Sequence, residues 1–281
     1  MLKKNIIIFL IPLFMAVFIL SNPIKSLAAK KITFIKLKIP FAVEVPDGKW
    51  IDPWKNACEE ATITMIDQYY QGKNKLTNAE AKKLMLPIFT LENELFGFNK
   101  DTNAEETMQF INKFLSFTAT IKENPTLDEI KNELMVKRPV ISMHYGFELN
   151  NPALRFRQDG SSYHMMVISG FDDAKKEFIV QDSGNPKGLD FRYKYDTILK
   201  TLHDFDRITG QANGPARVLF TEPKTLVKVQ NGKRIYLISK TQKQYIAHPD
   251  IFKKRGWKWA NVKIVNKELL NTLTSGEPIW Q

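Results

Sequence analysis

The sequence is short of the residues on which several common sites and scaffolds depend. It has a single cysteine, Cys58, in 281 residues, so it can form no disulfide within the chain and no zinc site built on two or more thiolates. A hydrophobic share of 43% with 25% charged residues excludes a disordered chain, a collagen-like repeat and a membrane protein with many spans. We therefore expect one or two globular domains with a substantial core.

An apolar run long enough to direct export occurs at the start of the chain. Lys3 and Lys4 precede a run from residue 6 to 20, and the small residues Ser26 and Ala28 follow it. This pattern predicts a signal peptide over residues 1–28. The alternative is an uncleaved anchor, because such a run is short for a bilayer span but suffices for a thin one. Either way we expect the rest of the chain outside the cytoplasm, secreted or associated with the cell surface.

Positive charge is concentrated at the C-terminal end. Residues 225–281 carry eleven Lys or Arg against three acids, a net charge of +8, whereas residues 29–224 carry 27 of each sign. This division predicts attraction of the tail to an anionic cell-wall or membrane surface, with no role in nucleic-acid binding. The alternative is a solvated lysine-rich face that binds nothing.

The order of elements predicts an α+β protein. Apolar residues at helical spacing, capping residues and acidic first turns indicate helices at residues 58–70, 78–86, 103–116 and 127–136. Runs of β-branched and aromatic residues bounded by turn formers indicate strands at residues 139–144, 163–171, 178–181 and 217–221. Asn231-Gly232 predicts a hairpin between 227–229 and 234–239. We expect one domain over residues 30–223 and a small basic α/β accessory module over 224–281.

Cys58 is the first candidate for chemistry. It lies at the expected first turn of a helix, directly after the loop at residues 50–57. There the helix dipole and unpaired amides favour a thiolate and can hold a developing oxyanion. A lone cysteine more often packs as a small buried hydrophobe, so the position needs partners before it indicates catalysis.

His164 and Asp182 are candidates for those partners. His164 starts an apolar strand after a polar loop, and Asp182 ends the next strand. An antiparallel pairing would bring the carboxylate to the imidazole, where it accepts the Nδ1 proton and orients a general base.

The other three histidines are weaker candidates. His144 lies inside an apolar strand and is expected to be a satisfied core residue. His203, beside Asp204 and Asp206, could be one corner of a metal site, but without further ligands at a recognised spacing a surface helix is the better interpretation. His248 has no partner in the sequence.

Five segments resemble one protein family: IPF at 39–41, WIDP at 50–53, NACEEA at 56–61, YHMMVISGFD at 163–172 and EFIVQDSG at 177–184. They are similar to the peptidase C39-like family of papain-like cysteine peptidases, over roughly residues 39–220. The resemblance implies a papain-like fold with N-terminal helices and an antiparallel sheet. It also implies Cys58 as nucleophile, His164 as general base and Asp182 as the orienting residue.

One position departs from the family pattern. Members usually have a glutamine before the cysteine whose amide completes the oxyanion hole, whereas Glu44 and Asp52 occupy the candidate positions here. A carboxylate donates no hydrogen bond unless it is protonated. The oxyanion hole is therefore expected to use the backbone amide of Cys58 with Asn56 or another donor, or the enzyme is slow.

These features together predict an exported thiol hydrolase that cleaves peptide or amide bonds through an acyl-thioester at Cys58. The expected substrate is a peptide or a peptidoglycan stem, and no cofactor or metal is expected. A cell-wall amidase or endopeptidase is one alternative, and an inactive peptide- or wall-binding protein on the same fold is another. The tail resembles a short module at the ends of bacterial surface and secreted proteins through IYLI, PDIF, GWKW, VKIV and GEPI.

Overall fold

The computed structural model describes residues 32–154, 162–255 and 257–280. Residues 32–281 form one compact unit. The predicted signal peptide lies outside the described residues and stays a prediction. Among the described residues, no helix has both the length and the apolar character needed to cross a membrane.

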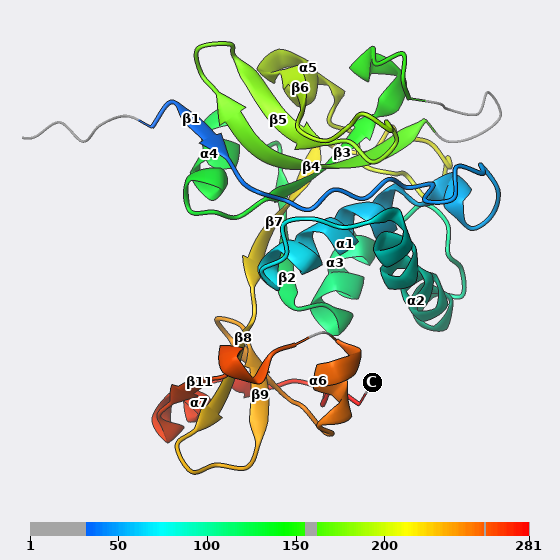
Figure 1. Ribbon diagram of the computed structural model, residues 1–281. Helices are drawn as coiled ribbons and strands as arrows, with labels where there is room; N and C mark the ends of the chain where they lie inside the picture. The colour runs from blue at the N-terminus through cyan, green and yellow to red at the C-terminus, as the bar shows by residue number, and fades with distance from the viewer. Residues whose placement is uncertain (1–31, 155–161, 256, 281) are drawn as a thin grey trace, which may run out of the picture. The chain divides into compact units, whose positions relative to one another are not determined.

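A 7-stranded antiparallel sheet forms the centre of the larger part of the molecule (Figure 1). Its strands are β1 (Phe34–Lys36), β2 (Phe117–Glu123), β3 (Val140–Tyr145), β4 (Tyr163–Asp172), β5 (Glu177–Gln181), β6 (Phe191–Lys194) and β7 (Arg217–Pro223). They are ordered β2-β7-β3-β4-β5-β6, and β1 pairs with β4. The central strands β3 and β4 are buried along almost their whole length, which explains their nearly unbroken apolar sequences.

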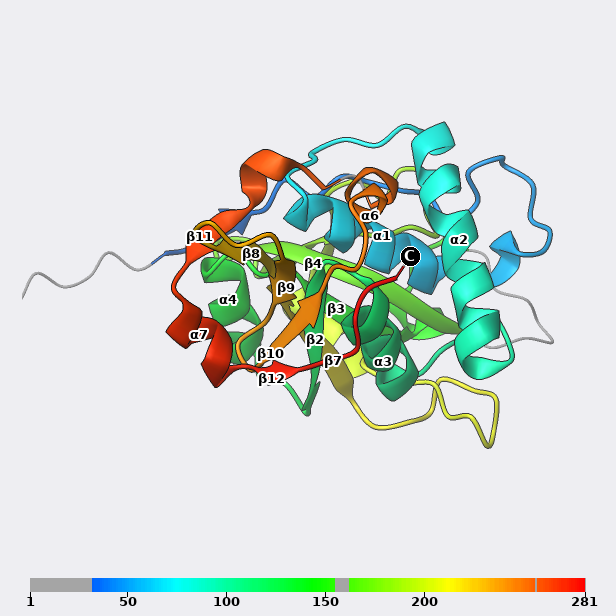
Figure 2. The same ribbon diagram turned by 90° about the horizontal axis from the view of Figure 1, so that it is seen from below.

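Helices cover the sheet on both sides. They are α1 (Cys58–Tyr70), α2 (Asn78–Phe96), α3 (Ala104–Phe114), α4 (Leu127–Met135) and α5 (Tyr195–Thr201), with 3-10 turns at Trp54–Asn56 and Gly146–Leu149. Figure 1 shows α1, α2 and α3 together on one side of the sheet, with α5 on the other, and Figure 2 shows the side that α1, α2 and α3 cover. The Thr62 hydroxyl donates to the Met165 carbonyl at 3.2 Å, which ties α1 to β4. The fold is α+β, as the order of elements predicted.

The helices begin close to the residues that the sequence predicted, but one of them ends much later than predicted. Asn103 with Glu106 forms the expected capping box. Helix α2, predicted to end at residue 86, continues through Pro87 to Phe96. Pro87 lies on the exposed side of α2, where water can satisfy the carbonyl that loses its helical partner. Ile88 and Phe89 are buried, so packing outweighs the cost of the proline.

Two carboxyl groups are buried where α1 and α2 pack together. Glu60 and Glu92 are 1% and 2% exposed. Burial raises the pKa of Glu60, and the charge of Glu92 raises it further. Burial also raises the pKa of Glu92, to about 7. The folded protein therefore holds protons at a pH where the unfolded chain has released them.

This pair predicts that the protein becomes less stable as the pH rises. The free energy of unfolding should fall between about pH 5 and about pH 8, because the pKa of Glu92 is higher in the folded state than in the unfolded chain. Glu92→Gln should weaken this dependence and raise the unfolding free energy at about pH 8 by on the order of 2 kcal/mol. Denaturant unfolding at both pH values measures the effect, with Glu94→Gln, at an exposed position on the same helix, as the control. The same pH slope in Glu92→Gln as in the wild type would contradict the expectation.

A second sheet follows Lys224. Its strands are β8 (Thr225–Val229), β9 (Ile235–Ile238), β10 (Gln242–Tyr245), β11 (Lys263–Val265) and β12 (Thr274–Ser275), in the order β11-β8-β9-β10-β12. The helices α6 (Asp250–Lys254) and α7 (Lys267–Thr272) and a 3-10 turn at Trp259–Asn261 complete it. Gly232 N–H donates to the Val229 carbonyl at 2.8 Å, so Asn231-Gly232 makes the predicted hairpin turn. The change of sheet lies at the predicted boundary, but the division into two domains stays a prediction.

The aromatic residues of this C-terminal segment differ in burial. Trp257 is buried in a small core with Phe252 and Ile251. Trp259 is 57% exposed and stacks on Phe252, with ring centroids 4.1 Å apart. Trp257 is therefore part of this small core, whereas Trp259 lies on the surface.

Candidate active site

Cys58 is the first residue of α1, as the sequence predicted. The 3-10 turn at Trp54–Asn56 leads into it. The side chain is buried, and its Sγ donates to Glu59 Oε2 at 3.0 Å. Glu59 is held in turn by the backbone N–H of Thr102, 2.8 Å from its Oε1. Sequence reasoning did not single out Glu59, because an acidic first turn is an ordinary helix-start feature.

The environment of Cys58 differs from the one expected at a helix start. Burial raises the pKa of the thiol, and the charges of Glu59 and Glu44 raise it further. The sequence position had predicted a lowered thiol pKa from the helix dipole. Desolvation and nearby carboxylates outweigh the dipole, because both disfavour a second negative charge in a dry site. The resting thiol is therefore neutral.

His164 and Asp182 are brought together by the sheet. Val167 of β4 lies opposite Gln181 of β5, so Asp182, directly after β5, lies beside the start of β4. His164 Nε2 is 2.8 Å from Asp182 Oδ1. The sequence had predicted this bond, but through Nδ1. Both side chains are buried.

His164 and Asp182 stabilise each other's charged forms. Burial alone would lower the pKa of His164, but the charge of Asp182 and its hydrogen bond raise it overall. Burial alone would raise the pKa of Asp182, but His164 lowers it overall. A charged Asp182 thus stabilises a protonated imidazole, which a general base needs after it has taken a proton.

Two residues that sequence reasoning missed hold Asp182 in place. Its Oδ2 accepts from the Tyr193 hydroxyl at 2.8 Å and from Asn151 Nδ2 at 3.2 Å. Asn151 also donates to the Tyr193 hydroxyl oxygen at 2.6 Å. Tyr193 belongs to β6, which was not predicted, and Asn151 lies in a loop with no distinguishing pattern. The pairing of β5 with β6 brings Tyr193 near Asp182, and the loop after the 3-10 turn at Gly146–Leu149 brings Asn151.

His144 lies directly opposite His164 in the pairing of β3 with β4, yet its environment is different. Its Nδ1 is 2.8 Å from the Thr201 hydroxyl and its Nε2 is 2.8 Å from the Ser142 hydroxyl. Burial lowers its pKa to about 3, so the ring stays neutral. This is the satisfied core histidine that the sequence predicted.

Glu44 is the third group beside the thiol. Its carboxylate, Cys58 Sγ and a ring nitrogen of His164 lie within 4.8 Å of one another, and all three residues are buried. The Glu44 N–H donates to the Ser183 carbonyl at 3.1 Å. Burial raises the pKa of Glu44 to about 7, although the charge of His164 acts to lower it.

Asp52 and Asn56, the other two candidates for the oxyanion hole, lie in the turn and loop before Cys58. The Asp52 side chain is 84% exposed, and its Oδ2 lies 3.4 Å from Lys55 Nζ, so this carboxylate belongs to the solvent-facing surface. Asn56 is half-buried at the end of the 3-10 turn, two residues before Cys58. Of the two carboxylates, Glu44 is therefore the one that the fold brings to the thiol.

The remaining histidines lie in ordinary surroundings. His203 follows α5 instead of lying in a helix, and its Nδ1 is 3.1 Å from the Gly214 carbonyl oxygen. Asp204 accepts from the backbone N–H of Ala104, the first residue of α3, at 3.0 Å. His248, without a partner in the sequence interpretation, lies 3.2 Å from Asp250.

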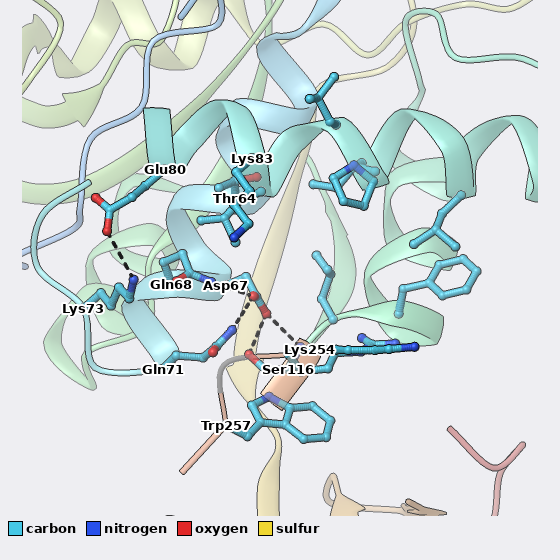
Figure 3. Close-up of a pocket in the computed structure, with 18 of the residues that line it drawn as sticks. Thr64, Asp67, Gln68, Gln71, Lys73, Glu80, Lys83, Ser116, Lys254 and Trp257 are labelled. Atoms are coloured by element: carbon cyan, nitrogen blue, oxygen red, sulfur yellow. Dashed lines mark hydrogen bonds and ion pairs between the residues drawn. The ribbon is translucent and has the colours of Figure 1, made fainter. Parts of the chain in front are cut away.

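A hollow of about 1010 Å³ lies elsewhere, between α1, α2, the end of α3 and the segment around α6 (Figure 3). Asp67 accepts from Gln71 and Ser116 in it, and Lys73 lies 3.8 Å from Glu80. Neither the thiol nor His164 lines this hollow. It is separate from the candidate active site.

The sequence pattern of the "Peptidase_C39 like family" matches residues 37–213. The matched region covers more than half of the chain and contains Cys58, His164 and Asp182. The chain belongs to this family. A comparison with curated proteins found no match.

This C39-like chain is also similar to two solved structures. One is a protein from Bacillus anthracis assigned as a C39-like peptidase, with 14% identity and a TM-score of 0.43 over 66% of this chain and 96% of that one. The other is the wild-type endolysin LysIME-EF1, with 12% identity and a TM-score of 0.21 over 77% of this chain and 99% of that one. Likenesses this distant carry no information about substrate or mechanism.

Proposed function

We propose that this C39-like peptidase is an exported thiol hydrolase that cleaves peptide or amide bonds at Cys58. The observation that carries the proposal is the meeting of three buried groups from distant parts of the chain. Cys58 Sγ lies within 4.8 Å of a ring nitrogen of His164, and that ring is bonded to Asp182 at 2.8 Å. A nucleophile, a base and a group that orients the base are the parts that covalent amide hydrolysis needs.

In this mechanism His164 removes the thiol proton as the sulfur attacks the amide carbon. Because Nε2 is bonded to Asp182, we assign the proton transfer to Nδ1. The imidazolium then gives the proton to the leaving amine, and an acyl-thioester remains on Cys58. Water, activated by the neutral imidazole, attacks the thioester and releases the acid. Since the resting thiol is neutral, the base has to act in the attack step itself.

The oxyanion of the tetrahedral intermediate requires hydrogen-bond donors. The backbone N–H of Cys58, in the first turn of α1, is one candidate. We assign the second to the Glu44 carboxyl in its protonated form. A pKa of about 7 keeps a useful fraction of Glu44 protonated at neutral pH, so a glutamate can serve where the family usually has a glutamine.

This assignment predicts a loss of activity in alkaline solution. As the pH rises above about 7, Glu44 loses the proton that it donates, and kcat/KM should fall. Glu44→Gln carries an amide donor at every pH, so its kcat/KM should exceed that of the wild type by about 10-fold at about pH 8 and should match it at about pH 5. Steady-state hydrolysis of a fluorogenic peptide measures both, with Asp52→Asn as the control. Parallel pH profiles for the wild type and Glu44→Gln would remove Glu44 from the oxyanion hole.

Labelling tests the function as a whole. A peptide with a thiol-reactive electrophile should modify Cys58, as read by mass spectrometry of the purified protein. No labelling and no turnover would favour an inactive peptide- or wall-binding protein. Release of muropeptides from isolated cell walls would favour a cell-wall amidase or endopeptidase over a general peptidase.

We also propose that the C-terminal segment holds the enzyme on an anionic cell-wall or membrane surface. Its net charge is +8, and lysines around α6 are exposed beside the exposed Trp259. Charge of one sign gathered on one segment attracts polyanions over a distance of about 8 Å at physiological ionic strength.

A charge-removal experiment tests this surface. The tail variant replaces three exposed lysines with glutamine: Lys253, Lys254 and Lys258. The matched control does the same at three exposed lysines of the body: Lys175, Lys187 and Lys200. The tail variant should sediment less with anionic vesicles or cell walls than the control, and added salt should weaken wild-type binding. Equal binding of the two variants, insensitive to salt, would show that the lysines are only a solvated face.

A further inference from the structure

Three different metal-ligating atoms meet at one point of the molecule. A carboxylate oxygen of Glu44, the sulfur of Cys58 and a ring nitrogen of His164 lie within 4.8 Å of one another. They come from the segment before α1, from the start of α1 and from β4, so only the folded chain brings them together. All three residues are buried.

This donor set matches the chemistry of one class of cation. Thiolate and imidazole are poor ligands for Ca²⁺ and Mg²⁺, which take oxygen, but they suit Zn²⁺, which also accepts a carboxylate. In a tetrahedral zinc site with bonds of about 2.0–2.3 Å, the ligand atoms lie about 3.3–3.8 Å apart. Side-chain movements of about 1 Å therefore suffice to bring the three ligand atoms to bonding distance around an ion.

We propose that Glu44, Cys58 and His164 form a reversible Zn²⁺ site that holds the hydrolase inactive while the ion is bound. On binding, the Cys58 thiol and any protonated Glu44 carboxyl release their protons to solvent. The thiolate sulfur, the Glu44 carboxylate and the neutral His164 ring then bond to the ion. The two charges of Zn²⁺ then offset those of the thiolate and the Glu44 carboxylate.

The surroundings prepare the site for an ion. His164 Nε2 is bonded to Asp182, which is the carboxylate–histidine arrangement that orients metal-binding imidazoles. Tyr193 and Asn151 hold that carboxylate.

Gly184 keeps the space beside these ligands open. A Cβ at this position would lie 2.9 Å from His164 Cε1 and 3.5 Å from Glu44 Oε2. A side chain there would press on one ligand and contact a second. The glycine therefore leaves both free to adjust around an ion.

The consequence for hydrolysis rests on the proposed function, whereas the binding itself does not. A thiolate bonded to zinc is a poor nucleophile toward an amide, and an imidazole bonded to zinc cannot accept a proton. The residue that distinguishes this site from a simple Cys–His pair is Glu44. With the usual glutamine in its place, the second anionic ligand is lost.

Metal binding tests the site without any need for activity. The full chain is titrated with Co²⁺, which gives a thiolate-to-cobalt charge-transfer band when sulfur is a ligand, and Zn²⁺ affinity is measured by competition with a chromophoric chelator. We expect one ion per chain, with the band present in the wild type and lost in Cys58→Ser. Glu44→Gln should weaken Zn²⁺ binding by about 100-fold. Loss of a direct ligand should cost at least as much affinity as loss of a residue that only hydrogen-bonds a ligand. The exposed Asp52→Asn should bind like the wild type.

Three results would overturn the proposal: no charge-transfer band, a band that persists in Cys58→Ser, or unchanged Zn²⁺ affinity in Glu44→Gln. Near-ultraviolet circular dichroism of each variant confirms that the fold is kept, and His164→Ala supplies a second ligand variant should Glu44→Gln unfold. The experiments can disprove the metal site and the hydrolase activity independently of each other. A cobalt band without hydrolysis of any substrate would leave the metal site standing and remove the enzyme. Hydrolysis that stoichiometric Zn²⁺ does not inhibit would leave the enzyme standing and remove the inhibitory site.

Discussion

Replacement of Cys58 by alanine should lower kcat/KM for peptide hydrolysis by about 10⁴-fold or more while leaving the fold intact. Loss of a catalytic nucleophile removes the covalent route entirely, and what remains is substrate binding and oxyanion stabilisation. The fold should survive, because the exchange removes only one buried sulfur atom, which leaves a small cavity. Turnover of a fluorogenic peptide and the thermal unfolding midpoint measure the two effects.

Cys58→Ser is the matched control for this experiment. Its hydroxyl can still donate to Glu59, as the thiol does at 3.0 Å, but it is a much weaker nucleophile in the same place. Both variants should therefore lose activity to a similar extent. Turnover in either variant at the wild-type rate would show that the bond-forming group lies elsewhere.

The second large effect separates the base from the residue that orients it. His164→Ala should remove nearly all activity, by about 10⁴-fold, because the proposed mechanism passes the thiol proton through this imidazole to the leaving amine. Asp182→Asn should retain part of it, with a loss of about 10- to 100-fold, the size of effect seen when an outer partner of a functional histidine is removed. The asparagine oxygen can still accept from His164 Nε2.

The geometry around Asp182 explains why the loss of activity in Asp182→Asn should be partial instead of complete. The new amide nitrogen would take the place of Oδ2, which now accepts from both Tyr193 and Asn151. The Tyr193 hydroxyl can turn to accept, and the Asn151 amide can flip. Steady-state kinetics of both variants, with His203→Gln as the control, give the comparison. Equal losses for His164→Ala and Asp182→Asn would mean that Asp182 does more than orient the ring.

Local sequence signals were enough for the parts of the fold that follow local rules. The start of α1 at Cys58 and the capping box at Asn103 are contained in a few adjacent residues. The end of α2 is different, because its residues after Pro87 are helical only through burial against the core. Strand β2 was also missed, and its partner β7 is distant in the sequence. The elements α5 and β6 were missed because they are too short to show a periodic pattern.

In the candidate active site, too, some features can be predicted from local sequence and others depend on long-range packing. The order of Cys58, His164 and Asp182, and the family to which they belong, can be read from the sequence because motifs preserve residue type and spacing. Which nitrogen of His164 meets Asp182, and which residues hold that carboxylate, cannot be read from it. Those contacts depend on the register of β4 with β5, on the pairing of β5 with β6 and on the loop that carries Asn151.

The sequence alone therefore determined the α+β class, the helix that presents the thiol and the three residues offered for catalysis. Only the tertiary structure decided that the thiol is neutral, that Asp52 faces solvent and that Glu44 lies beside Cys58. The physical reason is that a pKa and a ligand set depend on burial and on the charges within a few ångströms. Those neighbours are set by long-range packing, which no local pattern of residues records.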